Sequence, residues 1–385
     1  MNKNIPFAKE EYQSRMDQLL DTIKATGLDA VLLCRQENLH YLTGFHTTGY
    51  WSFQNLIITA DGRIRFIVRH FEALNVDAYS WMESYRAYKD DEDPVAILAD
   101  ELTQLGLAYG KIGMEKANGF FFGIGNFQRL TELLPNMDID DCSLLLERIR
   151  SVKSPAELVY VRKAAGMVSQ AMKDGYTAVK EGVPEAAVAA AVYTSLLRSG
   201  SGFLANPPFI ASGQKTGLGH ATWGDKVIED GDNVYFELVA SCNRYHVPLM
   251  RTICLNKPRT AFAQKIAETS LAAVAAALDA IRPGATAHDV DYAARSTILK
   301  LGMGAYFRHR TGYSVGVAYP PGWPEGGLLS LRPGNEEVLR PGMVLHLPLV
   351  LLGAELGGAG FSESVLVTEG GSEVLTTVLR EFRMV

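Results

Sequence analysis

The sequence predicts a mixed α/β (α+β) fold with two domains. Over residues 1–146, helical periodicity alternates with short apolar strands, which is typical of a sheet flanked by helices. Over residues 147–385, helical segments surround a long β-hairpin, which indicates an antiparallel sheet. A chain of 385 residues is long enough to bury a core in each domain.

The first domain opens with a helix over residues 8–26, because its apolar positions recur at helical spacing and Gly27 can end it. A buried strand is expected at residues 28–34. Asp61-Gly62 is a turn signal between two apolar runs, so residues 54–68 should form a hairpin. The alternation continues with a helix, a strand and a helix near residues 94–106, 111–115 and 125–134.

The second domain starts at a helix-capping signal. Ser154, Pro155 and Glu157 occupy the N-cap, N1 and N3 positions of a capping box, so a helix begins there. The glycine-rich run 353–360 is expected to be a flexible loop. Further helices are predicted at residues 184–198, 261–281 and 287–301, and short strands near 344–352 and 362–367.

The hairpin carries the residue that most needs an explanation. Its strands are expected over residues 233–239 and 245–255, and Glu237 lies among apolar neighbours in the first of them. Because burying an unpaired carboxylate is costly, Glu237 must be paired, hydrogen-bonded or functional. His220 lies upstream and can act as a general acid or base, since imidazole titrates near neutral pH.

Composition limits the class of partner. The net charge of −6 and the isoelectric point near 5.8 argue against binding to nucleic acid. No run of 18 apolar residues and no signal-peptide core are seen, so no membrane partner is expected. The four cysteines show no CxxC spacing and are expected to be reduced thiols. We therefore predict a cytoplasmic α/β enzyme or binding protein.

Several separated motifs resemble the pita-bread family, which is the creatinase/prolidase or peptidase M24 family. They are the hairpin, the helix start at 150–157, His309-Arg-Thr-Gly-Tyr313 and Pro341-Gly-Met-Val344. The resemblance implies a creatinase/prolidase-type α/β domain over residues 1–146 and a pita-bread catalytic domain over residues 147–385.

The metallopeptidases of this family hold two metal ions with two aspartates, a histidine and two glutamates. The resemblance places other residues at those positions: Glu237, Pro248, Tyr313, Pro348 and Ser362. Proline has no ligating side chain, and a divalent ion needs several donors. The resemblance therefore implies a metal-free relative, and no cofactor is expected.

The sequence is most similar to the ectoine hydrolase branch of the family. The segments that carry this similarity include His220-Ala-Thr-Trp223, Arg244-Tyr-His-Val-Pro-Leu-Met-Arg-Thr252, Tyr319-Pro-Pro-Gly-Trp323 and Ser362-Glu-Ser364. Ectoine is a cyclic amidine bearing a carboxylate, and the branch opens its ring with water. The resemblance implies a metal-independent hydrolase of a C–N bond in a small polar amidine or amide.

The resemblance assigns catalysis to two residues. His220 matches the catalytic histidine of creatinase, and Glu237 is expected to act as a nucleophile or as a base for water. Substrate contacts are expected from a wider set of residues. This set is His246, Tyr313, His346, Glu363, Arg251, Trp223 and Tyr50.

Five of these seven residues also have a structural alternative. His246 and His346 share strand faces with the former ligand positions, but both can be core histidines. Arg251 and Glu363 can belong to ion pairs, and Trp223 can simply pack. Tyr50 matches a creatinase position that reaches a neighbouring subunit, which implies a homodimer with shared sites.

Two other functions stay open. One is an Xaa-Pro peptidase-like enzyme with a rearranged metal held by Glu237 and two or three histidines. The other is a catalytically inactive family member that binds peptide or protein partners. Metal analysis tests the first, and tolerance of His220→Ala and Glu237→Gln tests the second.

Overall fold

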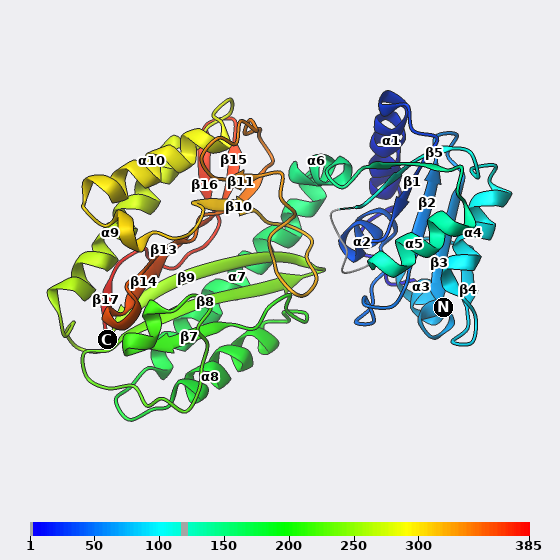
Figure 1. The fold of residues 1–385 in the computed structure, drawn as a ribbon. Coiled ribbons are helices and arrows are strands. Elements are labelled where there is room, and N and C mark those ends of the chain that lie inside the picture. The colour runs from blue at the N-terminus through cyan, green and yellow to red at the C-terminus, as the bar shows by residue number, and fades with distance from the viewer. Residues whose placement is uncertain (1–2, 117–121) are drawn as a thin grey trace. The chain divides into compact units, whose positions relative to one another are not determined.

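The computed structural model of the protein describes residues 3–116 and 122–385 and confirms the predicted α/β fold class. The chain divides into two compact units, Met1–Arg150 and Ser151–Val385 (Figure 1). The predicted boundary at residue 146 lies slightly earlier, inside helix α6 (Leu145–Ser151). Among the described helices, none is both long and apolar enough to span a lipid bilayer.

The first unit is built on a mixed sheet with the strand order β4-β3-β2-β1-β5-β6. Its central strand β1 sends Val31 and Leu33 into one apolar core and Ala30 and Leu32 into another, so both faces of the sheet are covered. The predicted hairpin is confirmed as the antiparallel pair β2–β3 around Asp61-Gly62. The elements are α1 (Lys9–Thr26), β1 (Ala30–Leu33), α2 (Gln36–Thr43), β2 (Asn55–Thr59), β3 (Ile64–Arg69), η1 (His70–Glu72), α3 (Ala73–Tyr79), β4 (Arg86–Tyr88), α4 (Pro94–Gln104), β5 (Lys111–Met114), α5 (Ile124–Leu133) and β6 (Asp138–Asp141).

The second unit surrounds several small sheets with four long helices. The sheets have the orders β17-β9-β8-β7, β11-β10-β12-β15-β16 and β13-β14. The helices are α7 (Pro155–Ala178), α8 (Glu185–Arg198), α9 (Ala261–Ala280) and α10 (Ala287–Lys300). The strands are β7 (Phe209–Ser212), β8 (Asn233–Cys242), β9 (Tyr245–Cys254), β10 (Gly312–Ser314), β11 (Ser330–Leu331), β12 (Val344–His346), β13 (Leu349–Leu352), β14 (Gly358–Phe361), β15 (Ser364–Thr368), β16 (Gly371–Val374) and β17 (Arg383–Met384).

The helices of the second unit begin where capping chemistry predicts. Ser154 and Glu157 form the expected capping box at the start of α7, and Thr286 caps α10 with Asp289. Helix α7 packs against β8 and β9, whereas α9 packs against α10 and the β13–β14 pair (Figure 1). The hairpin therefore lies between two helical layers.

The hairpin itself is long and has a fixed register. Asn243 and Arg244 form its two-residue turn with φ of 47° and 67°, as a type I′ turn requires. This register sets Glu237 opposite Met250 on β9, and Phe209 of β7 is the partner of Glu237 on the other side. Directly paired residues point to the same face, so these three side chains meet.

The predicted bounds of two strands are wrong. The segment 344–352 divides into β12 and β13, which belong to different sheets, and the chain leaves the first sheet at Leu347-Pro348. Proline cannot donate to a strand ladder, which accounts for a break at this point. The strand predicted at 362–367 begins later, at Ser364, because Ser362 and Glu363 connect β14 to β15, which belongs to a different sheet.

The glycine-rich run 353–360 is also not the flexible loop that was expected. It contains the short helix η4 (Ala354–Leu356) and the buried strand β14. Helix η2 (Gly213–Gly217), which leads toward His220, packs on η4. A Cβ atom on Gly217 would collide with the backbone of Ala354, so only glycine permits this close approach.

We expect Gly217→Ala to destabilise the second unit by about 1–3 kcal/mol, because the added methyl group forces η2 away from η4. Gly166→Ala in α7 is the matched control, since nothing lies near its added Cβ atom and alanine favours a helix. Thermal unfolding of the two variants measures this difference. Equal unfolding temperatures would contradict the tight η2–η4 contact.

Candidate active site

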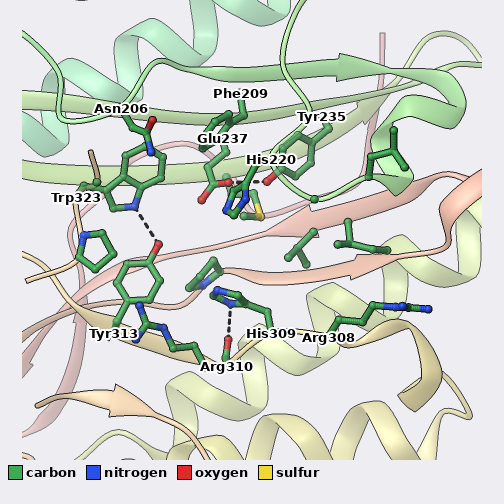
Figure 2. Close-up of a pocket in the computed structure, with 18 of the residues that line it drawn as sticks. Asn206, Phe209, His220, Tyr235, Glu237, Arg308, His309, Arg310, Tyr313 and Trp323 are labelled. Carbon is green, nitrogen blue, oxygen red and sulfur yellow. Dashed lines mark hydrogen bonds between the residues drawn. The ribbon is translucent and has the colours of Figure 1, made fainter. Parts of the chain in front are cut away.

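A cavity of about 550 Å³ opens in the second unit, which is the size of a small-molecule site. Its apolar wall includes Phe209, Met250, Pro348, Val350 and Leu352. Its polar residues are Asn206, His220, Tyr235, Glu237, Arg308, His309, Arg310, Tyr313 and Trp323 (Figure 2). The hairpin, the loops around 206–220 and 308–324, and β13 thus converge on one space.

Glu237 is the only acidic residue among the described residues that line the cavity. The Tyr235 hydroxyl donates a hydrogen bond to its Oε2 at 2.7 Å. Burial raises the pKa of Glu237 to about 7, although the bond from Tyr235 acts to lower it. The carboxyl group therefore exchanges its proton near neutral pH, which suits a general acid or base.

His220 lies at the exposed edge of the cavity. Its backbone has φ of 56°, a left-handed conformation that is uncommon for residues other than glycine and costs about 1 kcal/mol or more. Its ring packs against Phe209 with centroids 5.5 Å apart. Figure 2 shows His220 and Glu237 entering the same cavity, one from the loop after η2 and the other from β8.

Tyr313 stands between an indole and an imidazole. Trp323 Nε1 donates to the Tyr313 hydroxyl at 2.9 Å, and His346 Nδ1 lies 3.2 Å from the same oxygen. Burial raises the pKa of Tyr313 and lowers the pKa of His346 well below its ordinary value, so both stay neutral. Tyr313 lines the cavity, whereas His346 does not, so the predicted substrate contact from His346 is wrong and its ring instead contacts the Tyr313 hydroxyl.

Several cavity residues were not predicted as site residues. Strand alternation could have identified Tyr235, two positions before Glu237 on the same face. Arg308, His309 and Arg310 lie in a coil where no periodicity orients side chains. His309 Nδ1 lies 2.8 Å from the Arg310 carbonyl oxygen, and burial lowers the pKa of His309.

The comparisons with known proteins place the chain in a family. The model described as metallopeptidase family M24 matches residues 159–369, more than half of the chain, and a creatinase/prolidase N-terminal domain model matches residues 15–152. The protein belongs to metallopeptidase family M24.

Named relatives of this M24 chain are hydrolases. It is 28% identical to an ectoine hydrolase of Halomonas elongata, with 98% of each chain covered. A prolidase structure from Pyrococcus horikoshii is 25% identical, with 96% and 99% covered and a TM-score of 0.83. A dipeptidase structure from Mycobacterium ulcerans, 24% identical, shares the fold at a TM-score of 0.85 with 98% and 99% covered. The chain is thus a hydrolase of family M24.

The residues of this M24 member do not fit the metal centre that the family implies. Pro248 and Pro348, which the resemblance places at two of the five ligand positions, have side chains without a donor atom. Within residues 3–116 and 122–385, no group of three or more histidine, cysteine, aspartate or glutamate side chains is placed to hold a metal ion. This finding also disfavours a single metal held by Glu237 and two or three histidines.

The predicted substrate contact from His246 is wrong, because His246 does not line the cavity. It shares a strand face with Met250, but four residues of strand separate the two by about 13 Å. Both of its ring nitrogens are engaged: Nδ1 lies 2.7 Å from the Arg244 carbonyl oxygen, and Nε2 accepts from the Ala205 amide at 3.2 Å. Burial keeps the pKa of His246 well below its ordinary value, so it is a neutral core histidine.

Arg251 and Glu363 also lie outside the cavity. Strand alternation turns Arg251 to the face opposite Met250, where its Nη2 donates to Glu363 Oε1 at 2.9 Å. Thr376 donates to the other Glu363 oxygen at 2.7 Å. The pair is fully buried and connects β9 to the segment between β14 and β15. Their placement supports the structural alternative.

The predicted contact from Trp223 is wrong, whereas the prediction for Tyr50 concerns a neighbouring subunit and stays a prediction. Trp223 packs edge-on against Tyr193 of α8, with ring centroids 5.7 Å apart, and does not line the cavity. Tyr50 belongs to the first unit, where its ring meets Trp51 at 5.5 Å. The residues brought together as predicted are His220, Glu237 and Tyr313.

We expect Glu237→Gln to raise stability at pH 8 but to have little effect at pH 5. The folded-state pKa is raised from 4.5 to about 7, so folding favours the protonated acid and the cost of its charge grows as pH rises between these values. The glutamine stays neutral, and the gain at pH 8 should be about 3 kcal/mol.

Glu363→Gln provides the matched control, because it removes a buried acid whose charge is paired. Breaking that pair should destabilise the protein by about 3–5 kcal/mol at both pH values. Thermal unfolding at pH 5 and pH 8 compares the variants. A Glu237→Gln variant that is less stable than the wild type at pH 8 would contradict the claim that the ionised Glu237 carboxylate destabilises the folded protein.

Proposed function

We propose that the protein hydrolyses a C–N bond of a small polar amidine or amide without a metal ion, with ectoine-like compounds as the leading substrates. The observation that carries this proposal is the buried carboxyl of Glu237, whose pKa lies near 7 in an otherwise apolar wall. The similarity to the Halomonas elongata ectoine hydrolase supports the same substrate class.

The environment of Glu237 favours a cationic substrate. An amidine is protonated at neutral pH, and a positive charge within a few ångströms lowers the pKa of a carboxyl group. Binding of an amidinium therefore ionises Glu237 when the substrate arrives. The scissile amide of a peptide is neutral and supplies no such charge at the reacting carbon, although the amino terminus of a dipeptide is cationic.

The proposed reaction adds one water molecule to the amidine carbon. Glu237 as a carboxylate accepts a proton from that water while the oxygen forms its bond to carbon, or it attacks the carbon itself and water then releases the product. His220 protonates the leaving nitrogen as the C–N bond breaks. Tyr313, held by Trp323, contacts the substrate, and the apolar wall excludes water and strengthens these polar contacts.

The first test is substrate selection by metal-stripped protein. Ectoine, creatine and glycyl-proline are incubated separately, with and without added manganese, and the products are followed by mass. We expect ring opening of the amidine without metal, and we expect His220→Ala and Glu237→Gln each to lower kcat by about 10²-fold or more. Trp223→Phe, outside the cavity, is the control and should retain activity.

Two other outcomes are informative. Cleavage of glycyl-proline alone, and only after manganese is added, would favour the Xaa-Pro peptidase and contradict the proposal. Full function of both His220→Ala and Glu237→Gln in every assay would favour the inactive, partner-binding alternative.

We also propose a cytoplasmic homodimer in which Tyr50 completes the neighbouring subunit's site. A mixture of refolded Tyr50→Ala and Glu237→Gln chains should then recover activity that neither variant has alone, because mixed dimers contain one intact site. No recovery in a mixture shown to contain mixed dimers would contradict shared sites.

A further inference from the structure

Arg310 is one of two arginines among the described residues that line the cavity. Arg310 is half-buried, and none of the described acidic residues forms an ion pair with it. Burial lowers the pKa of its guanidinium, Tyr313 acts to raise it, and the like-charged Arg332 lowers it further. Burying a cation without a counter-ion is costly, so this arrangement points to an anion supplied by a ligand.

The guanidinium of Arg310 is held in a defined orientation. Its Cζ atom lies 4.4 Å from the centre of the Tyr313 ring, and its Nη1 donates to Ser330 Oγ at 3.1 Å. A stacked guanidinium keeps its remaining N–H groups in one plane, which matches the two oxygens of a carboxylate. Arg308 lines the same cavity and adds a second positive charge.

The acid and the arginines approach the cavity from different elements. Glu237 comes from β8, whereas Arg308 and Arg310 come from the coil before β10 (Figure 2). Tyr313 lies near both groups: the Arg310 guanidinium is over its ring, and Glu237 acts to raise its pKa. The cavity thus has an acidic residue on one element and basic residues on another.

We propose that Arg310, assisted by Arg308, binds the carboxylate of a zwitterionic substrate whose cationic amidine lies against Glu237. This assignment rests on the proposed function and narrows its substrate class to amidines that bear an acid group. Arg310 takes the carboxylate-binding role that the sequence suggested for Arg251, because the Arg251 guanidinium already donates hydrogen bonds to Glu363 and to backbone carbonyls.

The test compares two cyclic amidines that differ only in the carboxylate. Binding of ectoine and of 2-methyltetrahydropyrimidine, the same ring without the acid group, is measured by calorimetry. We expect the wild type to bind ectoine at least about 10-fold more tightly. Arg310→Gln should weaken ectoine binding by about 10- to 100-fold and the neutral ring by less than about 3-fold.

Two further variants control for folding and for simple charge. Arg310→Lys keeps the charge but lacks the planar fork, so it should recover only part of the loss, and it carries the test if Arg310→Gln fails to fold. Arg332→Gln removes a nearby exposed arginine that does not line the cavity and should change ectoine affinity by less than about 3-fold.

Equal affinity of the wild type for the two rings, or equal losses for both rings in Arg310→Gln, would overturn the assignment. Failure of the proposed function has a different signature, which is turnover of glycyl-proline alone. In that case the binding test uses glycyl-proline and its C-terminal carboxamide in place of the two rings. Arg310→Gln is then expected to weaken binding of the free acid by the same factor as it was expected to weaken binding of ectoine. Equal losses for the acid and the carboxamide would overturn the assignment there as well.

Discussion

The carboxyl group of Glu237 is held among Phe209, Met250 and Pro348, with the Tyr235 hydroxyl as its hydrogen-bond partner. In such surroundings the charged form is penalised, and its pKa rises to about 7. The hairpin register fixes this position, because a slip of one residue would turn Glu237 to the α7 face. The apolar side chains of Phe209, Met250 and Pro348 produce this burial, and a cationic ligand would lower the pKa of the buried acid.

The polar groups of the second unit separate into two sets. Those away from the cavity satisfy one another: Arg251 pairs with Glu363, and His246 bonds to the Arg244 carbonyl and the Ala205 amide. Two groups in the cavity differ: Glu237 is a buried acid with a raised pKa, and Arg310 forms no ion pair with any described acidic residue. The proposed zwitterionic substrate would supply a partner of opposite charge to each of them.

The sequence was sufficient for the hairpin, the capping boxes and the roles of Glu237 and His220 as cavity residues, because each depends on local patterns. It failed where the chain leaves a regular element. Alternation was extended through Pro348, where the chain changes sheets, so His346 was expected to line the cavity. His246 lies on the expected face but too far along it. Arg310 lies in coil, where sequence spacing carries no direction.

The protonation of Glu237 is the central claim, and infrared difference spectroscopy tests it most directly. A pH titration of wild-type and Glu237→Gln protein, with glutamate labelled by carbon-13, isolates the band of one buried protonated carboxyl group. The account predicts that this band disappears with a midpoint near pH 7 and is absent from the variant. A midpoint near the ordinary value of 4.5, or identical spectra for the two proteins, would contradict it.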